Sequence, residues 1–250
     1  MEPAAVAGYL AHARTAAHQR RLAEARAVIA QALAASRRPY IAFSTGKDSL
    51  VLAHLVWEQA PATPAVYFDA RCAFPESLAL LDRLAAAGRP IERWPCQDFL
   101  DLLAAAGGPD APGIEQATMA GTVYRPVRAL LAARGYDAVF LGLRGAESPA
   151  RSLLVRTRGL LFSRATDGLL ECLPLGRWSD RDVWAAIFAG GLDYNRAYDR
   201  MADLPPAQRR LSYWAGETSR RYGRWVWLRR HYPALWARFV QRFPEVARFT

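Results

Sequence analysis

Short apolar runs alternate with longer segments of helical spacing along most of this chain, and this alternation limits the fold more than any other feature. The apolar runs of strand length are residues 40–43, 65–68, 91–94 and 138–142. Strand alternating with helix is typical of an open parallel sheet. We therefore predict an α/β fold, with an open, mostly parallel twisted sheet and helices on both faces.

The pattern changes after residue 158. Residues 159–163 and 169–173 flank the sequence Ala-Thr-Asp-Gly at 165–168, which is typical of a β-hairpin. Ser179, with a carboxylate three residues later, predicts the start of a helix that stops at Gly190.

Composition divides the chain into three predicted parts. Residues 1–36 are rich in Ala, Leu and Arg and predict an N-terminal helical segment. Residues 37–204 form the predicted α/β domain, in which 77–87 and 122–134 are expected to be helical. Residues 205–250 begin with the Pro-Pro pair 205–206 and predict a basic, aromatic, helical C-terminal extension.

The overall composition excludes several classes of protein. With 52% hydrophobic and 22% charged residues, the chain can bury a core, which excludes wholesale disorder. Its three cysteines, Cys72, Cys96 and Cys172, are too few and too scattered for a disulfide scaffold. No apolar run approaches the roughly 20 residues that cross a bilayer, and the N-terminus lacks the order of a signal peptide. We expect a cytoplasmic protein without a membrane partner.

Positive charge is concentrated near the C-terminus. The formal net charge is +10, and residues 201–250 hold ten arginines, three acidic residues and four of the eight tryptophans. Such a stretch favours a polyanionic partner such as DNA. The candidate contact residues are Arg220, Arg221, Trp225, Trp227, Arg229 and Arg230. The alternative is a helical cap whose aromatic side chains are core and whose arginines are solvated.

Lysine is almost absent from the sequence. Of 33 basic residues, Lys47 is the one lysine and the others are arginine. Arginine is used at every other basic position, so this lysine marks a place where a planar guanidinium does not substitute for a compact ammonium.

Lys47 lies in the loop Ser44-Thr45-Gly46-Lys47-Asp48-Ser49, between a predicted strand and a predicted helix. Backbone N–H groups at a helix start, together with the helix dipole, favour a bound anion, and glycine allows close approach. Serine hydroxyls add donors and Lys47 adds a movable cation. The spacing differs from that of the P-loop NTPases. We interpret the loop as a phosphate-binding site.

The loop closely resembles the SGGxDS loop of the ATP pyrophosphatases, the adenine nucleotide α-hydrolase group, which cleave ATP between the α- and β-phosphates. Thr45 departs from that pattern because it stands where the family usually has glycine. That position must accept a side chain without strain or use an additional hydroxyl.

Three further segments resemble the 3′-phosphoadenylylsulfate (PAPS) reductase branch of this group. Residues 68–77 resemble its DTGxxFPET motif, and residues 141–151 resemble GxRxxESxxR. Residues 173–184, followed by Tyr194-Asn195, resemble its P-x-x-x-W segment and the YN pair after it. The motifs occur in the family's order from residue 40 to residue 200.

The resemblance implies ATP as ligand and Mg²⁺ as cofactor. It assigns phosphate contacts to the loop, that is to Ser44, Thr45, Gly46, Lys47, Asp48 and Ser49. Asp69 ends the second predicted strand and is expected to bind the nucleotide or hold Mg²⁺. Arg144 and Arg151 are expected to grip phosphate or sulfate oxygens. The residues expected to act in catalysis are Lys47, Asp48, Asp69 and Arg144.

Reductases of this branch use a cysteine near the C-terminus, whereas residues 173–250 contain none. A thiol-dependent reduction is therefore not expected. The first hypothesis is an ATP pyrophosphatase that activates an acceptor for sulfur insertion, as in DNA phosphorothioation, with partners that include a cysteine desulfurase. The second resembles the small subunit of sulfate adenylyltransferase, and the third is a non-catalytic nucleotide-binding scaffold.

Cys72 lies three residues after Asp69, in a segment where the family has no obligatory thiol. The neighbouring Arg71 is expected to lower the pKa of the Cys72 thiol, which would suit a sulfur carrier. The alternative is a small buried side chain.

Overall fold

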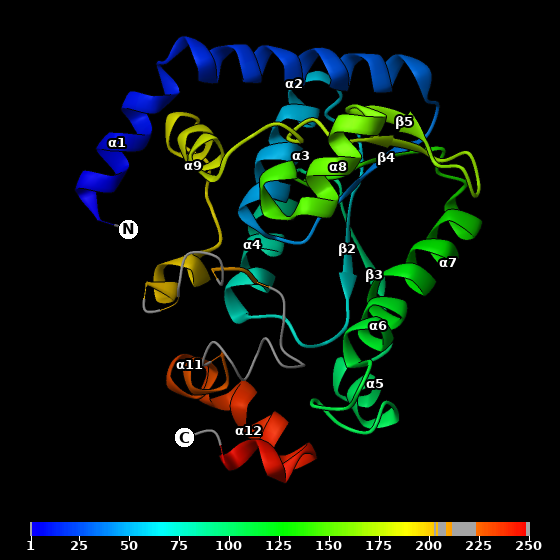
Figure 1. Cartoon of the computed structure of the whole chain (residues 1–250), viewed down its shortest axis with the longest axis vertical. Helices are drawn as coiled ribbons and strands as arrows, with labels where there is room; N and C mark the ends of the chain where they lie inside the picture. The colour runs from blue at the N-terminus through cyan, green and yellow to red at the C-terminus, as the bar shows by residue number, and fades with distance from the viewer. Residues whose placement is uncertain (1, 203, 205–208, 212–223, 249–250) are drawn as a thin grey trace. The chain divides into compact units, whose positions relative to one another are not determined.

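The computed structural model describes residues 2–202, 204, 209–211 and 224–248, and the elements below belong to those residues (Figure 1). Six strands form one sheet in the order β3-β2-β1-β4-β6-β5. Their bounds are β1 Pro39–Ala42, β2 Ala65–Asp69, β3 Ile91–Pro95, β4 Ala138–Phe140, β5 Leu161–Ser163 and β6 Leu170–Cys172.

The sheet is mostly parallel. Strand β1 pairs in parallel with β2 and β4, and β4 pairs in parallel with β6. Strand β5 runs antiparallel to β6, so the hairpin is confirmed. Ile41 in β1 lies opposite Ala65 and Phe140, and all three side chains are fully buried. A central strand covered on both faces needs apolar residues throughout, which is why the strands read as continuous apolar runs.

Helices flank this sheet and confirm the predicted α/β class. Their bounds are α1 Pro3–Ala13, α2 Ala16–Ala35, α3 Lys47–Gln59, α4 Pro75–Ala86, α5 Phe99–Ala105, α6 Ile114–Met119, α7 Arg125–Arg134, α8 Pro149–Arg158, α9 Asp180–Ala189, α11 Arg224–His231 and α12 Pro233–Arg242. We predicted no helix in the segments that form α5, α6 and α8. The helix expected over 122–134 begins instead with a π-helical turn, Ala120–Tyr124.

The chain divides into two compact units. Unit 1 comprises residues 1–67, 80–92 and 131–195, and unit 2 comprises 68–79, 93–130 and 196–250. Each unit combines segments from distant parts of the chain, whereas the predicted boundaries after residues 36 and 204 divide it in sequence order.

In unit 1 the N-terminal helices pack on the α/β core. Helix α2 contacts α3 and β6, and α9 contacts both α1 and α3. Figure 1 shows α2 as a long helix beside α3. Helix α3, whose first turn belongs to the loop of interest, thus contacts both β1 and α9.

Unit 2 contains the described part of the C-terminal extension, and aromatic rings form its core. The ring of Phe74 lies 4.5 Å from that of Tyr232 and 5.7 Å from that of Trp227, measured between centroids. Trp225 packs on Phe239 at 5.0 Å. The helical character predicted for this extension is confirmed in α11 and α12.

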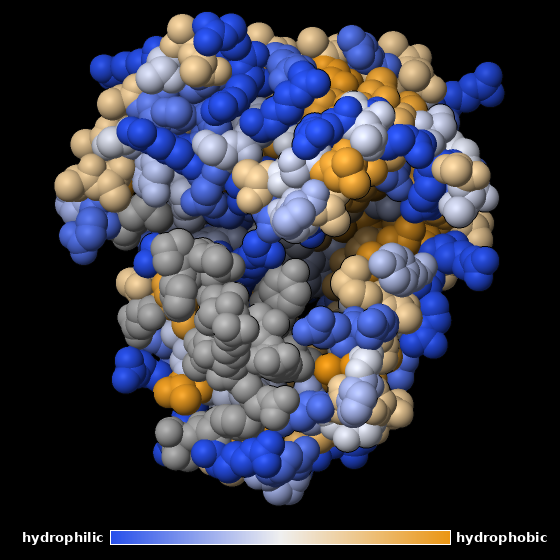
Figure 2. Space-filling model, viewed as in Figure 1, coloured by the Kyte–Doolittle hydropathy of each residue, from blue (hydrophilic) through white to orange (hydrophobic). Residues whose placement is uncertain are grey.

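Among the described residues, no helix is both long enough and apolar enough to cross a bilayer. On the face shown in Figure 2, hydrophilic side chains are spread widely and hydrophobic residues occur in smaller groups between them. Such a mixture is usual for a protein surface.

Candidate functional site

The loop between β1 and α3 brings several polar groups together in unit 1. Gly46 is the N-cap of α3, with extended backbone angles φ −72° and ψ 159°. The Ser44 N–H donates to Ser49 Oγ at 3.2 Å, and the Ser49 hydroxyl donates to the Gly46 carbonyl at 3.0 Å. These bonds fold the loop back on the first turn of α3, so its hydroxyl groups gather at the helix N-terminus.

Thr45 occupies this loop in a conformation that favours glycine. Its φ is +60°, in the left-handed region, and it is almost fully buried. Its hydroxyl donates to the Ser44 carbonyl at 2.6 Å and accepts from the Asn195 side-chain amide at 3.4 Å. The backbone cost of a β-branched residue there is therefore offset by two hydrogen bonds. The side chain that departs from the family pattern uses its hydroxyl structurally.

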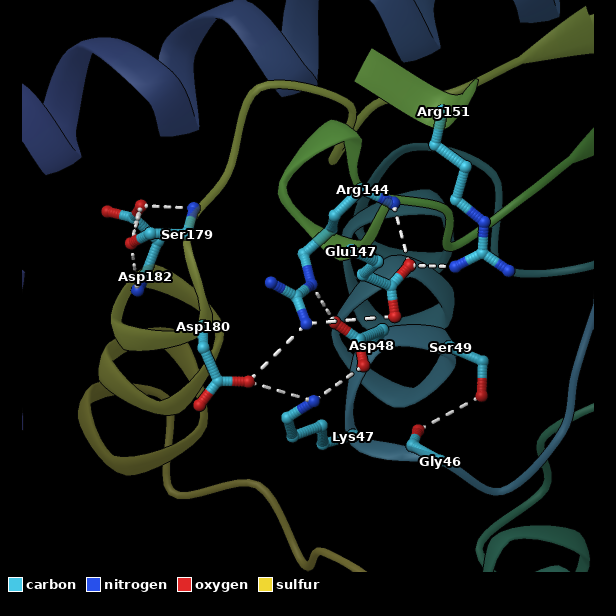
Figure 3. Close-up of polar contacts among 10 residues, drawn as sticks. All are labelled: Gly46, Lys47, Asp48, Ser49, Arg144, Glu147, Arg151, Ser179, Asp180 and Asp182. Atoms are coloured by element: carbon cyan, nitrogen blue, oxygen red, sulfur yellow. Dashed lines mark hydrogen bonds and ion pairs between the residues drawn. The ribbon is translucent and has the colours of Figure 1, made fainter. Parts of the chain in front are cut away.

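Lys47 is the first residue of α3, and its ammonium group is drawn into a cluster of carboxylates. Nζ lies 2.8 Å from Asp48 Oδ2 and 3.1 Å from Asp180 Oδ1, and the Lys47 side chain is only 8% exposed (Figure 3). A compact ammonium fits between these two oxygens, which agrees with the retention of lysine at this position.

Arg144 approaches the same carboxylates from the loop after β4. Its guanidinium contacts Asp48 Oδ1 through Nε and lies 3.4 Å from Asp180 Oδ1 through Nη2 (Figure 3). Gly142 makes this approach possible, because a Cβ there would lie 3.1 Å from the backbone between Asp48 and Ser49. Lys47 and Arg144 therefore share two carboxylates.

The two cations keep Asp48 ionised. Burial by itself raises the pKa of the Asp48 carboxyl, but Lys47 and Arg144 outweigh burial and lower that pKa below its ordinary value. The cluster therefore carries fixed charges of both signs.

A third carboxylate, Glu147, connects the two arginines expected at the site. The Arg144 backbone N–H donates to Glu147 Oε2 at 3.1 Å, and the Arg151 guanidinium pairs with the same oxygen (Figure 3). Arg151 thus contacts Glu147 and reaches the cluster through it. Its side chain is one-third exposed, whereas that of Arg144 is buried.

The structure places the six loop residues, Arg144 and Arg151 in one part of unit 1. It adds Asp180, Glu147 and Asn195, to which we assigned no site role from the sequence. Asp180 is the first residue of α9 and follows its cap, Ser179, so the capping motif alone explained an acidic residue there. Asp69 belongs to unit 2, where its Oδ1 accepts the N–H of Arg71 at 2.8 Å.

Residues 38–203 match the phosphoadenosine phosphosulfate reductase domain. The chain belongs to this family. The match includes the loop, Arg144 and Asp180, and it ends before the described part of the basic C-terminal extension.

Relatives of this PAPS reductase-family chain include two kinds of protein. Sulfate adenylyltransferase subunit 2 of Streptomyces lavendulae is 30% identical over 174 residues, which cover 60% of this chain and 53% of that protein. Phosphoadenosine 5′-phosphosulfate reductase of Gloeobacter violaceus is 26% identical over 171 residues, which cover 64% of this chain and 65% of that protein. The chain thus spans between about half and two thirds of these relatives.

Solved structures share the fold. A PAPS reductase from Candida auris superposes with a TM-score of 0.57 at 18% identity, over 70% of this chain and 84% of that one. The FMN adenylyltransferase of Candida glabrata gives 0.55 at 14% identity, over 78% and 64%. At these identities the likeness establishes the α/β nucleotide-hydrolase-like fold.

The family match ends before the residues that we expected to contact nucleic acid. Trp225 is 1% exposed and Trp227 is 4% exposed, and the Trp227 indole donates to the Arg200 carbonyl at 2.7 Å. Stacking on a base needs an exposed ring face, so the structure favours the alternative of core tryptophans. Arg229 and Arg230 are exposed. Arg220 and Arg221 lie outside the described residues.

Cys72 differs from the expectation for a reactive thiol. Burial raises the pKa of the Cys72 thiol to about 12, and the cation that opposes this is Arg238. The expected lowering by Arg71 is therefore wrong, because the cost of burying a thiolate exceeds the attraction of nearby cations.

Proposed function

We propose that this chain binds ATP at the β1–α3 loop and transfers its adenylyl group, releasing pyrophosphate. The observation that supports this most is the pair of buried cations, Lys47 and Arg144, held by Asp48 and Asp180 directly at the N-terminus of α3. Two fixed cations at a helix N-terminus suit a polyphosphate, because both attract negative charge.

Each residue has a role in this proposal. Lys47 and Arg144 bind phosphate oxygens and stabilise the charge that develops on them when the bond between the α- and β-phosphates breaks. Asp48 keeps both cations in place, and the Ser44 hydroxyl donates to the phosphates. The Ser49 hydroxyl donates to the Gly46 carbonyl and so keeps the loop folded around them. Asp180 is 59% exposed, so its carboxylate can leave the cations when phosphate arrives.

Mg²⁺ accompanies the nucleotide in this proposal and screens its phosphate charge. Asp69, in unit 2, is a proposed Mg²⁺ ligand on the basis of its own contacts. One of its carboxylate oxygens accepts a backbone N–H, which leaves the other as the hard oxygen ligand that Mg²⁺ prefers.

Sulfate is the acceptor that we place first. The relatives named sulfate adenylyltransferase subunit 2 support this choice, and so does the cysteine-free sequence from residue 173 onward. In this reaction a sulfate oxygen attacks the α-phosphorus and pyrophosphate leaves. The word subunit in those names supports a second chain as a partner.

A phosphodiester of DNA is the second candidate acceptor. The exposed Arg229 and Arg230 favour it, together with the excess of arginine in residues 201–250. The acceptor oxygen would be adenylylated before sulfur insertion, and a cysteine desulfurase would supply the sulfur. The burial of Trp225 and Trp227 places this candidate after sulfate.

Product analysis with labelled ATP and Mg²⁺ tests the proposal, with sulfate, DNA or neither added. We expect AMP or an adenylylated product together with pyrophosphate. Lys47→Met should abolish release of pyrophosphate, whereas Asp167→Asn, an exposed residue paired with Arg164, should leave it unchanged. ADP as the main product contradicts the proposal. ATP binding without turnover under all three conditions favours the scaffold. We also expect no thioredoxin-dependent reduction of PAPS.

A further inference from the structure

Unit 1 contains a second cluster of ionisable side chains, outside the phosphate loop. His12 lies in the last turn of α1, His18 in the first turns of α2, and Asp182 in the first turn of α9. His12 Nε2 is 2.8 Å from Asp182 Oδ1, and His18 Nδ1 is 3.1 Å from the same oxygen. The three atoms all lie within 4.8 Å of one another.

This cluster is buried. His18 is 2% exposed, the side chain of Asp182 is fully buried, and that of His12 is 15% exposed. Two imidazoles therefore converge on one carboxylate oxygen in a place with little access for water. Three side chains from three helices are brought together, although α9 is about 160 residues away from the two histidines in the sequence.

The other oxygen of Asp182 is fully engaged. Oδ2 accepts the Ser179 N–H at 2.7 Å and the Ser179 hydroxyl at 2.5 Å, and Arg21 Nη1 lies 2.5 Å away. These contacts fix the orientation of the carboxylate and leave Oδ1 directed at the imidazoles. Outer contacts that orient a carboxylate in this way are usual around metal ligands.

We propose that His12, His18 and Asp182 bind a divalent transition-metal ion of the zinc class. Two imidazole nitrogens and one carboxylate oxygen form a common ligand set for Zn²⁺, and a water molecule can complete the tetrahedron. The ion would lie between the two imidazole nitrogens and Asp182 Oδ1. Without the ion, hydrogen bonds join these atoms. A neutral imidazole binds through one nitrogen and keeps its proton on the other.

The charges near the site decide which ion it selects. Because Arg21 already pairs with Asp182, the carboxylate contributes less attraction than it would alone. Affinity then depends on the two imidazoles, and these nitrogen ligands favour Zn²⁺ or Co²⁺ over Mg²⁺. The site is therefore chemically distinct from the Mg²⁺ that would accompany a nucleotide.

The bound ion would join α1, α2 and the start of α9. Asp180, two residues before Asp182, faces Lys47 and Arg144. The ion would therefore fix the end of the helix that contributes Asp180 to the phosphate loop. Its role in this position is structural, and it takes part in no chemical step.

Metal titration of the metal-free full chain tests the proposal. With Zn²⁺ and a chromophoric chelator as competitor, we expect one ion per chain, and excess Mg²⁺ should not displace it. Co²⁺ should give visible d–d absorption without a thiolate charge-transfer band. At zinc about 100-fold above its Kd, the Tm should rise by roughly 5 to 10 °C. Failure of the wild-type chain to bind zinc, or a thiolate band, overturns the proposal.

Single substitutions locate the ion. His12→Gln and His18→Gln should each weaken zinc affinity by at least about 100-fold. Substituting a residue that only orients a metal ligand already costs up to about that much, and a ligand itself should cost no less. His54→Gln is the matched control, because His54 lies in α3 and pairs with Glu58. Circular dichroism checks that each variant is folded. If the His18 variant does not fold, the His12 variant provides the test, because His12 is the more exposed of the two. Unchanged affinity in the His12 variant overturns the assignment.

Discussion

The Asp180 carboxylate lies 3.1 Å from the Lys47 ammonium and 3.4 Å from an Arg144 guanidinium nitrogen, although it begins a helix more than 130 residues after Lys47. Asp180 is also the most exposed member of this group, at 59%. An exposed carboxylate between two buried cations occupies the kind of position that suits a phosphate. We infer that Asp180 competes with the nucleotide for Lys47 and Arg144.

Asp180→Asn should therefore tighten phosphate and ATP binding. Exposed ion pairs contribute about 0.2–1 kcal/mol, so we expect a Kd lower by a factor of roughly 1.4 to 5. Calorimetry with inorganic phosphate and with Mg-ATP measures this. Asp167→Asn removes an exposed carboxylate elsewhere in unit 1 and should have no effect. Weaker binding in Asp180→Asn would show that Asp180 positions the cations instead of competing for them.

Lys47→Arg should lower turnover sharply while it keeps the charge. The Lys47 side chain is 8% exposed and its ammonium lies within 3.1 Å of two carboxylates, so a forked guanidinium displaces its neighbours. A displacement of about 1 Å in such a site can cost on the order of 100-fold in rate. Steady-state release of pyrophosphate measures the effect, with circular dichroism to confirm folding. Near-normal activity in this variant would show that position 47 does not require a compact ammonium group.

Substitutions of Thr45 separate backbone strain from hydrogen bonding. Thr45→Ala keeps the left-handed conformation and loses both contacts of the hydroxyl, so we expect destabilisation by about 1–2 kcal/mol. Thr45→Gly loses the same contacts but relieves the backbone, and it should be more stable than Thr45→Ala by about 1 kcal/mol. Urea unfolding of both variants gives these differences. Equal stability of the Ala and Gly variants would mean that position 45 carries no strain.

The central strands and the loop between β1 and α3 could be predicted because local sequence determines them. A strand such as β1 is buried on both faces and must be apolar, and a strand-loop-helix with Gly46 and Lys47 restricts what the loop can bind. Arg144 was found for a similar reason, because it follows a recognisable buried strand and lies in a family motif.

Other parts of the site depend on tertiary packing and leave little local signal. Asp180 has the same sequence context as any acidic residue in the first turn of a helix, and only the packing of α9 against α3 brings it to Lys47. The burial of Trp225 likewise depends on Phe239 and Trp236 in the next helix. A count of arginines and tryptophans cannot distinguish a buried ring from an exposed one.

Cys72 should react slowly with alkylating reagents in the folded protein. With its pKa raised to about 12 by burial, on the order of one thiol in ten thousand is ionised at pH 8, and the thiolate is the reactive form. Labelling with iodoacetamide, followed by peptide mass spectrometry, measures the rate in buffer and in urea. We expect unfolding to accelerate the labelling of Cys72 strongly. Rapid labelling of Cys72 in the native chain would restore a sulfur-carrier role.

The exposed arginines of α11 provide the test of DNA as acceptor. If this surface binds DNA, replacing Arg229 and Arg230 with alanine should flatten the log–log salt dependence of binding by up to about 1.8, since each neutralised phosphate contributes roughly 0.7 to 0.9. A matched pair, Arg26→Ala with Arg177→Ala, removes two exposed arginines of unit 1 and should leave the slope unchanged. Trp225→Ala should instead lower the Tm and weaken every ligand alike, because the ring is core. If the slope is the same with and without Arg229 and Arg230, or if the wild-type chain does not bind DNA in low salt, DNA is excluded as the acceptor. Sulfate is then the acceptor to test.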